Sequence, residues 1–443
     1  MSTKVKRTSS RTRSPRFSGY TYQADTGGFF EYTLKRNGLR VLHRELSGTG
    51  VVTSNLTYRV GSRHEPRGKT GLAHMLEHML FMPTTNDAAA DRASAANRFE
   101  QETGALLNAN TSRDRTTYYF SYPREHFDRA LAIEADRMRN VRITEENFAP
   151  ERNNVLSEFD MYFSRPDFVL AMRMSGVAFH THPYGHEVIG FRDDIERYEV
   201  ADLCDFYDTY YRPDNATLTI VGDVSLREAL RAVERTFGEL VAPERAIPDF
   251  TITEAQPEGE RTVTVTRESN QNLLALGVRH AGFPSQAWHR TFVALSVLAG
   301  GPESILERSL VDTGLASNVE FMLEPTRDEN LAIIFITLAP GVAHDDVLTR
   351  VRQSLDTLDS STIAPLARKV IAGQLTEDAF VSASSLQLAL ELTEYVAADA
   401  WQTFLETESI LTSITPSAVM ATIHELFQPA RLTLGRFIGT QRP

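Results

Sequence analysis

The sequence predicts an α+β fold of two homologous domains, each a mostly antiparallel sheet packed with helices. The chain has 443 residues, which is more than one core usually holds, since domains of roughly 100–200 residues are common. The same succession of elements also occurs twice. YEVADLCDFYDTYYRPDNATLTIVGD and ITPSAVMATIHELFQPARLTLGRFIG each predict a helix, a turn with proline and an apolar strand. Such a repeat is typical of a duplicated domain.

The first domain is expected over residues 29–240. An Asn-Gly pair at 37–38 between two apolar runs predicts a hairpin. Apolar and polar residues then alternate over 56–60, which is the period of a strand with one buried face. A helix-rich region extends to about residue 210 and is followed by the strand ATLTIVGDV and a helix over about 226–237.

A linker is expected at residues 241–260, because this stretch holds three prolines and has no regular apolar period. The second domain is expected over 261–443. There RTVTVTRES and NLLALGVRH predict strands, and a helix follows from about Ser285. No metal-binding pattern occurs in this half, so it is expected to lack a metal site.

Composition restricts the function classes. The chain has 46 Lys and Arg against 58 Asp and Glu, a net charge of −12 and a pI of about 5.5. Nucleic-acid-binding surfaces are basic, so nucleic acid is not expected as the main partner. No apolar run reaches about 18 residues, so no membrane span is predicted. The single cysteine, Cys204, is expected to be a small buried hydrophobe rather than a nucleophile.

The first 28 residues are expected to form a basic, disordered tail. MSTKVKRTSSRTRSPRF holds six Lys or Arg, no acidic residue and no apolar run, so it does not resemble a secretory signal. A cytoplasmic location is therefore expected. The alternative is that the tail is a transit peptide, which would direct the protein to a mitochondrial or other organelle matrix.

The segment KTGLAHMLEHMLF predicts a helix with two different faces. Its Leu and Met residues recur at i, i+3, i+4 and i+7, which is typical of a core-facing stripe. On another face, His74 and His78 lie one turn apart, so both imidazoles can reach one metal ion, and Glu77 stands beside them. Two exposed histidines with a solvated Glu are the alternative, but that alternative does not explain the apolar stripe.

This set of residues suits zinc-dependent hydrolysis. Zinc lowers the pKa of bound water from about 15.7 to about 7. A carboxylate within hydrogen-bonding reach can accept a proton and return it to the leaving amine. H-x-x-E-H reverses the H-E-x-x-H of thermolysin-type enzymes and is the inverzincin motif. The sequence thus predicts a peptidase with one Zn²⁺ per chain, in which Glu77 is the general base.

Five segments, in order, resemble the pitrilysin/insulysin family of zinc metallopeptidases, which includes the mitochondrial processing peptidases. They are GSRHEPRGKTGLAHMLEHMLF, LLNANTSRDRTTYYF, ERNNVLSEFD, HPYGHEVIGFRDDI and FYDTYYRPDNATLTIVGDV. The similarity is strong over residues 29–240 and loose beyond them. It implies a clamshell in which two domains, or two chains, enclose a peptide substrate and select it by size and folding state.

The resemblance places the third zinc ligand at Glu158, with Glu151 as its supporting acidic catalytic neighbour. Both lie in NFAPERNNVLSEFDMYF, where Pro150 suits a first helical turn. The two glutamates are seven residues apart and therefore share one helix face. Without the resemblance, each would be interpreted as an exposed helix carboxylate.

The resemblance also assigns Asn108, Ala109 and Asn110 to the substrate-binding edge of a sheet. An extended peptide would pair there as an added strand, held by main-chain hydrogen bonds. An ordinary strand end is a compatible interpretation. A second metal site at the histidines of HTHPYGH, residues 180–186, is a weaker alternative, because HPYG matches a loop of the family.

The second domain departs from the family's pattern. Active members carry an Arg and, seven residues later, a Tyr, and this pair holds the substrate carbonyl and the developing oxyanion. Aligning GGPESILERSLVDTGLASNV on its Gly-Leu-Ala places Leu310 and Ser317 at these positions. No Tyr occurs between Tyr211 and Tyr395, so a local shift of the alignment does not restore one.

The expected function is a zinc-dependent endopeptidase that cleaves peptides or small unfolded precursors. The zinc ligands and the base are present, but the Arg/Tyr pair is missing. This combination favours the zinc-bearing subunit of a two-chain peptidase, that is, a heterodimer whose homologous partner supplies the pair. A homodimer, or a chain acting alone with another oxyanion donor, is the alternative. A non-catalytic scaffold subunit of the same family is the second function class, and a zinc hydrolase of a non-peptide substrate is the third.

Overall fold

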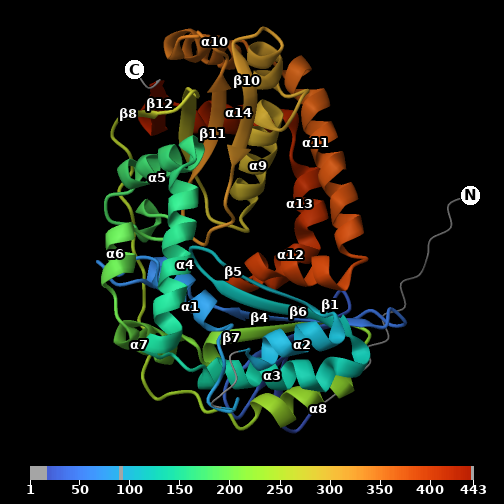
Figure 1. Cartoon of the computed structure of the whole chain (residues 1–443). Helices are drawn as coiled ribbons and strands as arrows, with labels where there is room; N and C mark the ends of the chain where they lie inside the picture. Colours follow the sequence, from blue (N-terminus) through green and yellow to red (C-terminus); the bar gives the residue numbers. More distant parts are fainter. Residues whose placement is uncertain (1–16, 89–92, 441–443) are drawn as a thin grey trace, which may run out of the picture.

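Two sheets, one in each half of the chain, organise the fold (Figure 1). The computed structural model describes residues 17–88 and 93–440. The first sheet contains β1 (Tyr20–Thr26), β2 (Phe29–Leu34), β3 (Arg40–Glu45), β4 (Val51–Tyr58), β5 (Leu106–Thr111), β6 (Thr116–Pro123) and β7 (Ala216–Gly222). The second contains β8 (Arg261–Glu268), β9 (Leu273–His280), β10 (Ala316–Met322), β11 (Asn330–Leu338) and β12 (Leu432–Thr440).

The two sheets share one topology. Their strand orders are β1-β2-β3-β7-β4-β6-β5 and β8-β12-β9-β11-β10. Each sheet is antiparallel except for one pair, β3 with β7 in the first and β8 with β12 in the second. The strands aligned by the sequence repeat, β7 and β12, therefore occupy equivalent places. The predicted α+β fold of two homologous domains is confirmed, and β1 and β2 extend the first copy.

Fourteen helices in the described residues surround the sheets, and none of them has the length and apolarity to cross a membrane. Serine caps fix two of the predicted helix starts, since Ser225 accepts from the backbone of Glu228 and Ser285 from that of Trp288. The first half holds α1 (Leu72–Met79), α2 (Ala95–Thr103), α3 (Phe127–Asn140), α4 (Glu145–Phe163), α5 (Pro166–Ala178), α6 (Arg192–Arg197), α7 (Val200–Tyr210) and α8 (Leu226–Phe237). The second holds α9 (Gln286–Ala299), α10 (His344–Asp356), α11 (Ser360–Val381), α12 (Ser385–Ala397), α13 (Thr407–Ser413) and α14 (Pro416–Leu426).

The two halves exchange a helix. Helix α5 of the first half packs on the second sheet, where Leu170 and Met174 join a cluster with Ala275 and Ile333. Helix α12 of the second half lies across β4 and β7 of the first sheet (Figure 1). The domain boundaries drawn from the sequence therefore do not separate two independent cores, because each sheet buries one face against a helix from the other half.

Polar residues in β4 show how closely α12 is bound. Asn55 is fully buried, and its side-chain amide donates to the Ala389 carbonyl at 2.9 Å and to the Thr393 hydroxyl at 2.8 Å. Thr53 bonds the hydroxyl of Ser385 at 3.1 Å. In a strand with one face in the core and the other in water, these polar side chains would be hydrated and would not need partners in the protein. The hydrogen bonds satisfy buried polar groups that would otherwise destabilise the interface.

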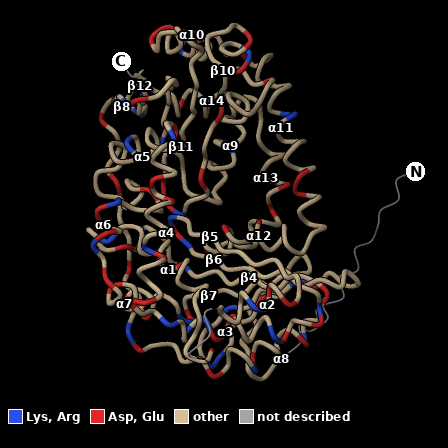
Figure 2. The backbone as a smooth tube through the Cα atoms, in the orientation of Figure 1, with Lys and Arg blue, Asp and Glu red and all other residues tan. Residues whose placement is uncertain are grey.

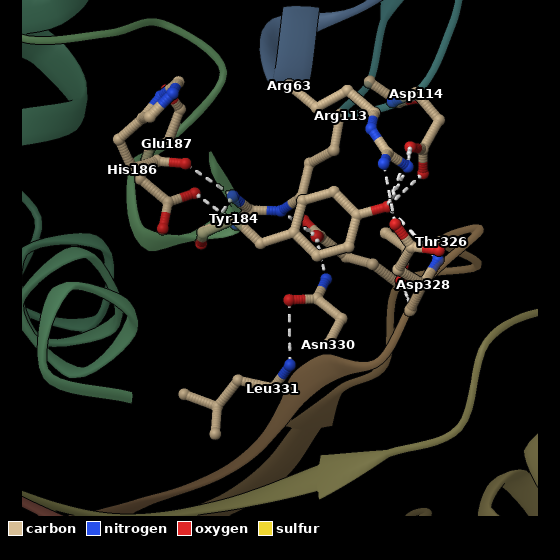
Figure 3. A network of polar contacts seen from close by, with 12 residues as sticks. Arg63, Arg113, Asp114, Tyr184, His186, Glu187, Thr326, Asp328, Asn330 and Leu331 are labelled. Carbon is tan, nitrogen blue, oxygen red and sulfur yellow. Dashed lines mark hydrogen bonds and ion pairs between the residues drawn. The ribbon is translucent and has the colours of Figure 1, made fainter. Parts of the chain in front are cut away.

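A buried ionic network joins the halves at the tip of the β5–β6 hairpin (Figure 3). Asp114 accepts from Arg63 at 2.9 Å, from the hydroxyl of Tyr184 at 2.7 Å and from the backbone N–H of Arg327 at 2.9 Å. Its neighbour Arg113 forms an ion pair with Glu324 at 2.6 Å. These contacts connect the first half to the β10–β11 loop of the second.

The predicted tail and linker need correction. Residues 1–16 lie outside the described residues, but Tyr20–Thr26 forms strand β1 rather than a tail, because Tyr20 is buried and its hydroxyl donates to the Leu230 carbonyl at 2.7 Å. The predicted linker at 241–260 has no helix or strand, as expected. It is nevertheless anchored, since Glu254 accepts the backbone N–H groups of Thr181 and His182 at 2.8 Å each. Despite burial, these backbone hydrogen bonds lower the pKa of Glu254 to about 2.

We predict that Asp114→Ala lowers the free energy of unfolding by about 3–5 kcal/mol, because the buried Arg63 would keep only its ion pair with Asp328. The Tyr184 hydroxyl would also lose its acceptor. Urea denaturation monitored by circular dichroism would measure the loss. Asp128→Ala is the matched control, because its ion pair with Arg235 is largely exposed and should contribute about 0–1 kcal/mol. Equal losses in the two variants would contradict a structural role for the network.

Candidate metal centre

The start of helix α1 is fixed by contacts from two distant segments. Glu65 accepts the backbone N–H groups of Gly71 and Ala73 at 2.8 Å each, so its carboxyl group satisfies donors that the first helical turn leaves free. Burial raises the pKa of Glu65 to about 8, and the two hydrogen bonds oppose this effect. Gly71 has a φ of +90°, and a Cβ there would lie 2.5 Å from the Ile189 carbonyl oxygen. Gly190 is required for the same reason, because a Cβ added there would lie 2.4 Å from the Thr70 carbonyl carbon. The segment HEVIGF thus helps to position the metal-site helix.

Helix α1 presents the two faces that its sequence predicts. Its Leu and Met residues are almost fully buried in the first core. His74, Glu77 and His78 are half-buried on the other face. The two imidazole rings have centroids 4.8 Å apart. Both rings therefore face one common space.

Glu158 of α4 completes a group of three metal-binding side chains. One oxygen of Glu158 lies 3.8 Å from His74 Nε2 and 3.5 Å from His78 Nε2. Tetrahedral zinc with bonds of about 2.1 Å separates its ligand atoms by about 3.4 Å. The three ligand atoms lie within 4.8 Å of one another, and no other such group occurs in the described chain. Two imidazole nitrogens and a carboxylate oxygen are a donor set that suits zinc, so these residues fit the ion that the sequence implies.

Helix α4 carries both glutamates on the face that meets α1. It begins earlier than expected, because Thr144 caps it by accepting from the backbone N–H of Asn147. Pro150 therefore lies inside the helix and not in its first turn. Its exposed position limits the cost of the missing backbone donor.

A second set of contacts orients the ligands. Glu151 lies 3.3 Å from His78 Nδ1, on the side of the ring away from the metal-facing nitrogen. It therefore supports a ligand and does not join the ligand set. Tyr162, one turn after Glu158, donates its hydroxyl to that carboxylate. Neither Tyr162 nor Glu65 was identified from the sequence, although Glu65 lies within a segment that resembles the family and Tyr162 lies two residues after another.

This packing shifts the pKa values of the ionisable side chains at the site. Burial alone would lower the pKa of His78, but hydrogen bonds to Glu151 and Glu158 raise it to about 9. Burial lowers the pKa of His74 to about 4. The hydrogen bond with His78 lowers the pKa of both glutamates. The two carboxylates are thus held ionised beside the imidazoles, as metal ligation requires.

Glu77 is held by a residue that the sequence interpretation missed. The hydroxyl of Thr111 donates to its carboxylate at 2.5 Å. Burial raises the pKa of Glu77, and the hydrogen bond from Thr111 opposes this. Thr111 lies in LLNANTS directly after the expected substrate edge, so the same strand that would bind a peptide also orients the expected base.

Asn108, Ala109 and Asn110 lie on β5, the edge strand of the first sheet. Strand β5 pairs only with β6, so its outer edge can accept another strand. The backbone N–H of Ala109 donates to the side-chain oxygen of Asn108 at 2.8 Å. Arg115 fixes the end of the strand by donating to the carbonyl of Asn110 at 2.9 Å and to its side chain at 2.7 Å.

The other residues that the sequence suggested as candidates lie outside this site. His182 bonds Asp328 and the backbone of Tyr184, and the histidines of HTHPYGH form no metal-binding group in the described chain. Leu310 is fully buried in the second core, and Ser317 lies exposed on β10. Cys204 is half-buried on α7 rather than fully buried, and burial raises the pKa of its thiol, which does not favour a nucleophile.

The two-domain fold and the group of three possible metal ligands can be assigned to a protein family. Sequence profiles support this assignment. The profile described as "Insulinase (Peptidase family M16)" matches residues 40–191, and that described as "Peptidase M16 inactive domain" matches residues 197–364. This chain belongs to the insulinase family of peptidases, family M16.

Individual relatives are named as zinc proteases. "Zinc protease PqqE" of Helicobacter pylori is 33% identical over 312 residues, which are 69% of this chain and 68% of that protein. "Uncharacterized zinc protease YmxG" of Bacillus subtilis is 27% identical over 81% of this chain and 84% of its own. The crystal structure of a protease from Helicobacter pylori has a TM-score of 0.86 and 26% identity, and the match covers 93% of this chain and 99% of that one.

We predict that Glu151→Gln weakens zinc binding by about 10–100-fold, because the partner of a ligating imidazole orients it and increases its basicity. Competition with a fluorescent chelator would measure the dissociation constant. Glu146→Gln, an exposed carboxylate in the first turn of α4, is the control and should bind zinc like the unaltered chain. Unchanged affinity in Glu151→Gln would remove this residue from the metal centre.

Proposed function

We propose that this chain is a zinc-dependent endopeptidase that cleaves peptides or small unfolded precursors. The observation that carries the proposal is the convergence of His74, His78 and Glu158 on one point, with Glu77 beside them. The zinc proteases named among the relatives support the same chemistry. We expect one Zn²⁺ per chain.

Different residues of this chain would perform different steps of the proposed reaction. The outer edge of β5 would pair with an extended peptide and place a peptide bond beside α1 through main-chain hydrogen bonds. Zinc, when bound, would polarise the scissile carbonyl and acidify a water molecule. Glu77, oriented by Thr111, would take a proton from the attacking water and deliver it to the leaving nitrogen. The raised pKa of Glu77 suits a group that must both accept and return a proton.

The second half of the chain supports a two-chain arrangement. Leu310 is packed inside the core, so the position expected to hold an Arg offers no charge. Ser317 on β10 is too short to replace a Tyr, although its hydroxyl is exposed. We infer that a homologous subunit in a heterodimer supplies the donors for the oxyanion. In the alternative, a homodimer or a chain that acts alone, another group would have to serve as the donor. A cytoplasmic location stays part of this proposal.

We predict that Glu77→Gln retains about one zinc per chain and loses peptidase activity by about 10²–10⁴-fold, because the amide cannot accept the proton. Metal analysis and cleavage of a quenched fluorescent peptide library would test both parts. Glu100→Gln, an exposed carboxylate on α2, is the matched control and should keep full activity. If neither the unaltered chain nor the variant cleaves any peptide, while both assemble with a partner, the chain is a scaffold instead.

We predict that the isolated chain turns over slowly and that a co-purifying homologous chain raises kcat by about 10²–10³-fold, the effect of adding one oxyanion donor. Size-exclusion chromatography combined with the peptide assay would measure assembly and rate together. The partner alone, which should be inactive, is the control. Full turnover by a monomer of this chain would rule out the two-subunit proposal.

A further inference from the structure

A second candidate site is a cavity of about 80 Å³ between α9, α11 and α12. This volume is several times the roughly 10–15 Å³ that one water molecule needs. Apart from one leucine, the residues around the cavity are aromatic, acidic or able to accept a hydrogen bond. They are Phe283, Trp288, His289, Phe292, Gln374, Asp378, Glu391, Tyr395, Thr407 and Leu411.

Two carboxylates at this cavity have no cation as a partner. Asp378 accepts only the side-chain amide of Gln374, at 2.9 Å, through its carboxylate. Glu391 makes no hydrogen bond or ion pair with any described residue. Burial, and then the charge of Asp378, raise the pKa of Glu391. Two like charges held near each other without a counter-charge favour the binding of an external cation.

His289 adds a buried acceptor that lacks a partner. It lines the cavity and is only 2% exposed. Its Nδ1 lies 2.9 Å from the Ser285 carbonyl oxygen, which can only accept, so Nδ1 carries the proton. Nε2 is therefore an acceptor, and it has no hydrogen-bond partner in the described chain. At the wall of the cavity, this buried nitrogen can accept a hydrogen bond from an N–H group of a ligand.

The aromatic side chains complete the surroundings that a cation prefers. The rings of Phe283 and Tyr395 have centroids 4.6 Å apart, and those of Trp288 and Phe292 are nearly parallel at 6.1 Å. The Trp288 N–H donates to the Glu324 carbonyl at 3.4 Å and is thereby occupied. Aromatic faces attract guanidinium and ammonium groups.

The wider surroundings are acidic. No Lys or Arg occurs between Lys369 and Arg431. The acidic residues in this interval are Glu377, Asp378, Glu391, Glu394, Asp399, Glu406, Glu408 and Glu425. Figure 2 shows the resulting acidic positions along α12, α13 and the adjoining end of α11. Three of these residues, Glu394, Asp399 and Glu425, form ion pairs with Arg115, Arg40 and Arg431. Asp378 and Glu391, at the cavity, have no such basic partner among the described residues.

Helix α12 connects this cavity to the substrate edge. Glu394, one turn after Glu391, forms an ion pair with Arg115. Arg115 in turn holds the carbonyl and side chain of Asn110 at the end of β5. Helix α12 also lies on the face of the first sheet that is turned toward the second half (Figure 1). Through Arg115, helix α12 is thus linked to the end of the strand that would bind a peptide.

We propose that the cavity between α9, α11 and α12 is a specificity site that binds one Arg or Lys side chain of the peptide substrate, with Asp378, Glu391 and His289 Nε2 as acceptors. This inference rests on the proposed peptidase function. A metal ion is not the expected occupant, because these three side chains do not form a metal-binding group among the described residues. A guanidinium group fits best, since it combines several donors with a flat face that can stack on aromatic rings.

Binding to the zinc-loaded Glu77→Gln chain tests the site without cleavage. The probes are fluorescent 15-residue peptides in which a single Arg is moved along an uncharged sequence, each paired with an isosteric citrulline peptide. At the position that reaches the cavity, Arg should bind about tenfold more tightly than citrulline. Adding Asp378→Asn and Glu391→Gln should abolish the difference, whereas Glu377→Gln, which removes the same charge from α11 outside the cavity, should preserve it. Thermal melting would verify that the variants fold.

The outcomes separate this inference from the proposed function. Equal binding of every Arg and citrulline pair, or a preference that survives the double substitution, overturns the cation site even if the unaltered chain cleaves peptides. A preference that depends on Asp378 and Glu391, in a chain that cleaves no peptide, supports the cation site and overturns the peptidase proposal instead. In an active chain, the double variant should raise KM for the Arg peptide and leave cleavage of the citrulline peptide unchanged.

Discussion

The tip of the β5–β6 hairpin is the constraint on which the arrangement of the two halves depends. Three consecutive charged residues each bind a different part of the second half. Arg113 pairs with Glu324, Asp114 bonds the backbone of Arg327, and Arg115 pairs with Glu394. Buried charges are costly unless they are paired, so a shift of one half against the other would leave several of them without partners. The exchanged helices α5 and α12 bury apolar surface across the same junction, and the charged contacts fix its register.

This junction also sets the geometry of the candidate site. The hairpin that carries the network begins with β5, whose Thr111 orients Glu77 and whose outer edge is free. Helix α1 is fixed by Glu65 and Ile189, and α4 brings Glu158 and Glu151 to its exposed face. The base, the ligands and the binding edge are thus held by elements that are themselves anchored. Under the proposed function, such preorganisation would allow binding energy to be used for catalysis rather than for ordering the site.

The sequence predicted what depends on local periodicity. The spacing in α1 placed two histidines and a glutamate on one face, and the repeat of helix, turn and strand implied equivalent places for β7 and β12. It did not predict the exchange of α5 and α12, because an apolar stripe identifies a buried face but not the surface that covers it. The role of Thr111 was missed for a similar reason, since it depends on how closely β5 approaches α1. Strand β1 was not predicted, because the basic residues that precede it suggested a disordered tail. The capping by Thr144 was not predicted either, because Pro150 suggested a later start of the helix.

The buried position of Leu310 determines how the missing donors for the oxyanion would have to be supplied. It is fully buried among the apolar residues of the second core, so no change of side-chain conformation could bring a polar group from that position to the metal centre. Under the proposed function, the second half of this chain therefore contributes to binding rather than to chemistry. At the cavity between α9, α11 and α12 it offers the carboxylates of Asp378 and Glu391 without a basic partner, which suits recognition of a basic side chain. A chain with a complete metal set, a binding edge and a cation site, but without an oxyanion donor, would need a second subunit for turnover and not for substrate recognition.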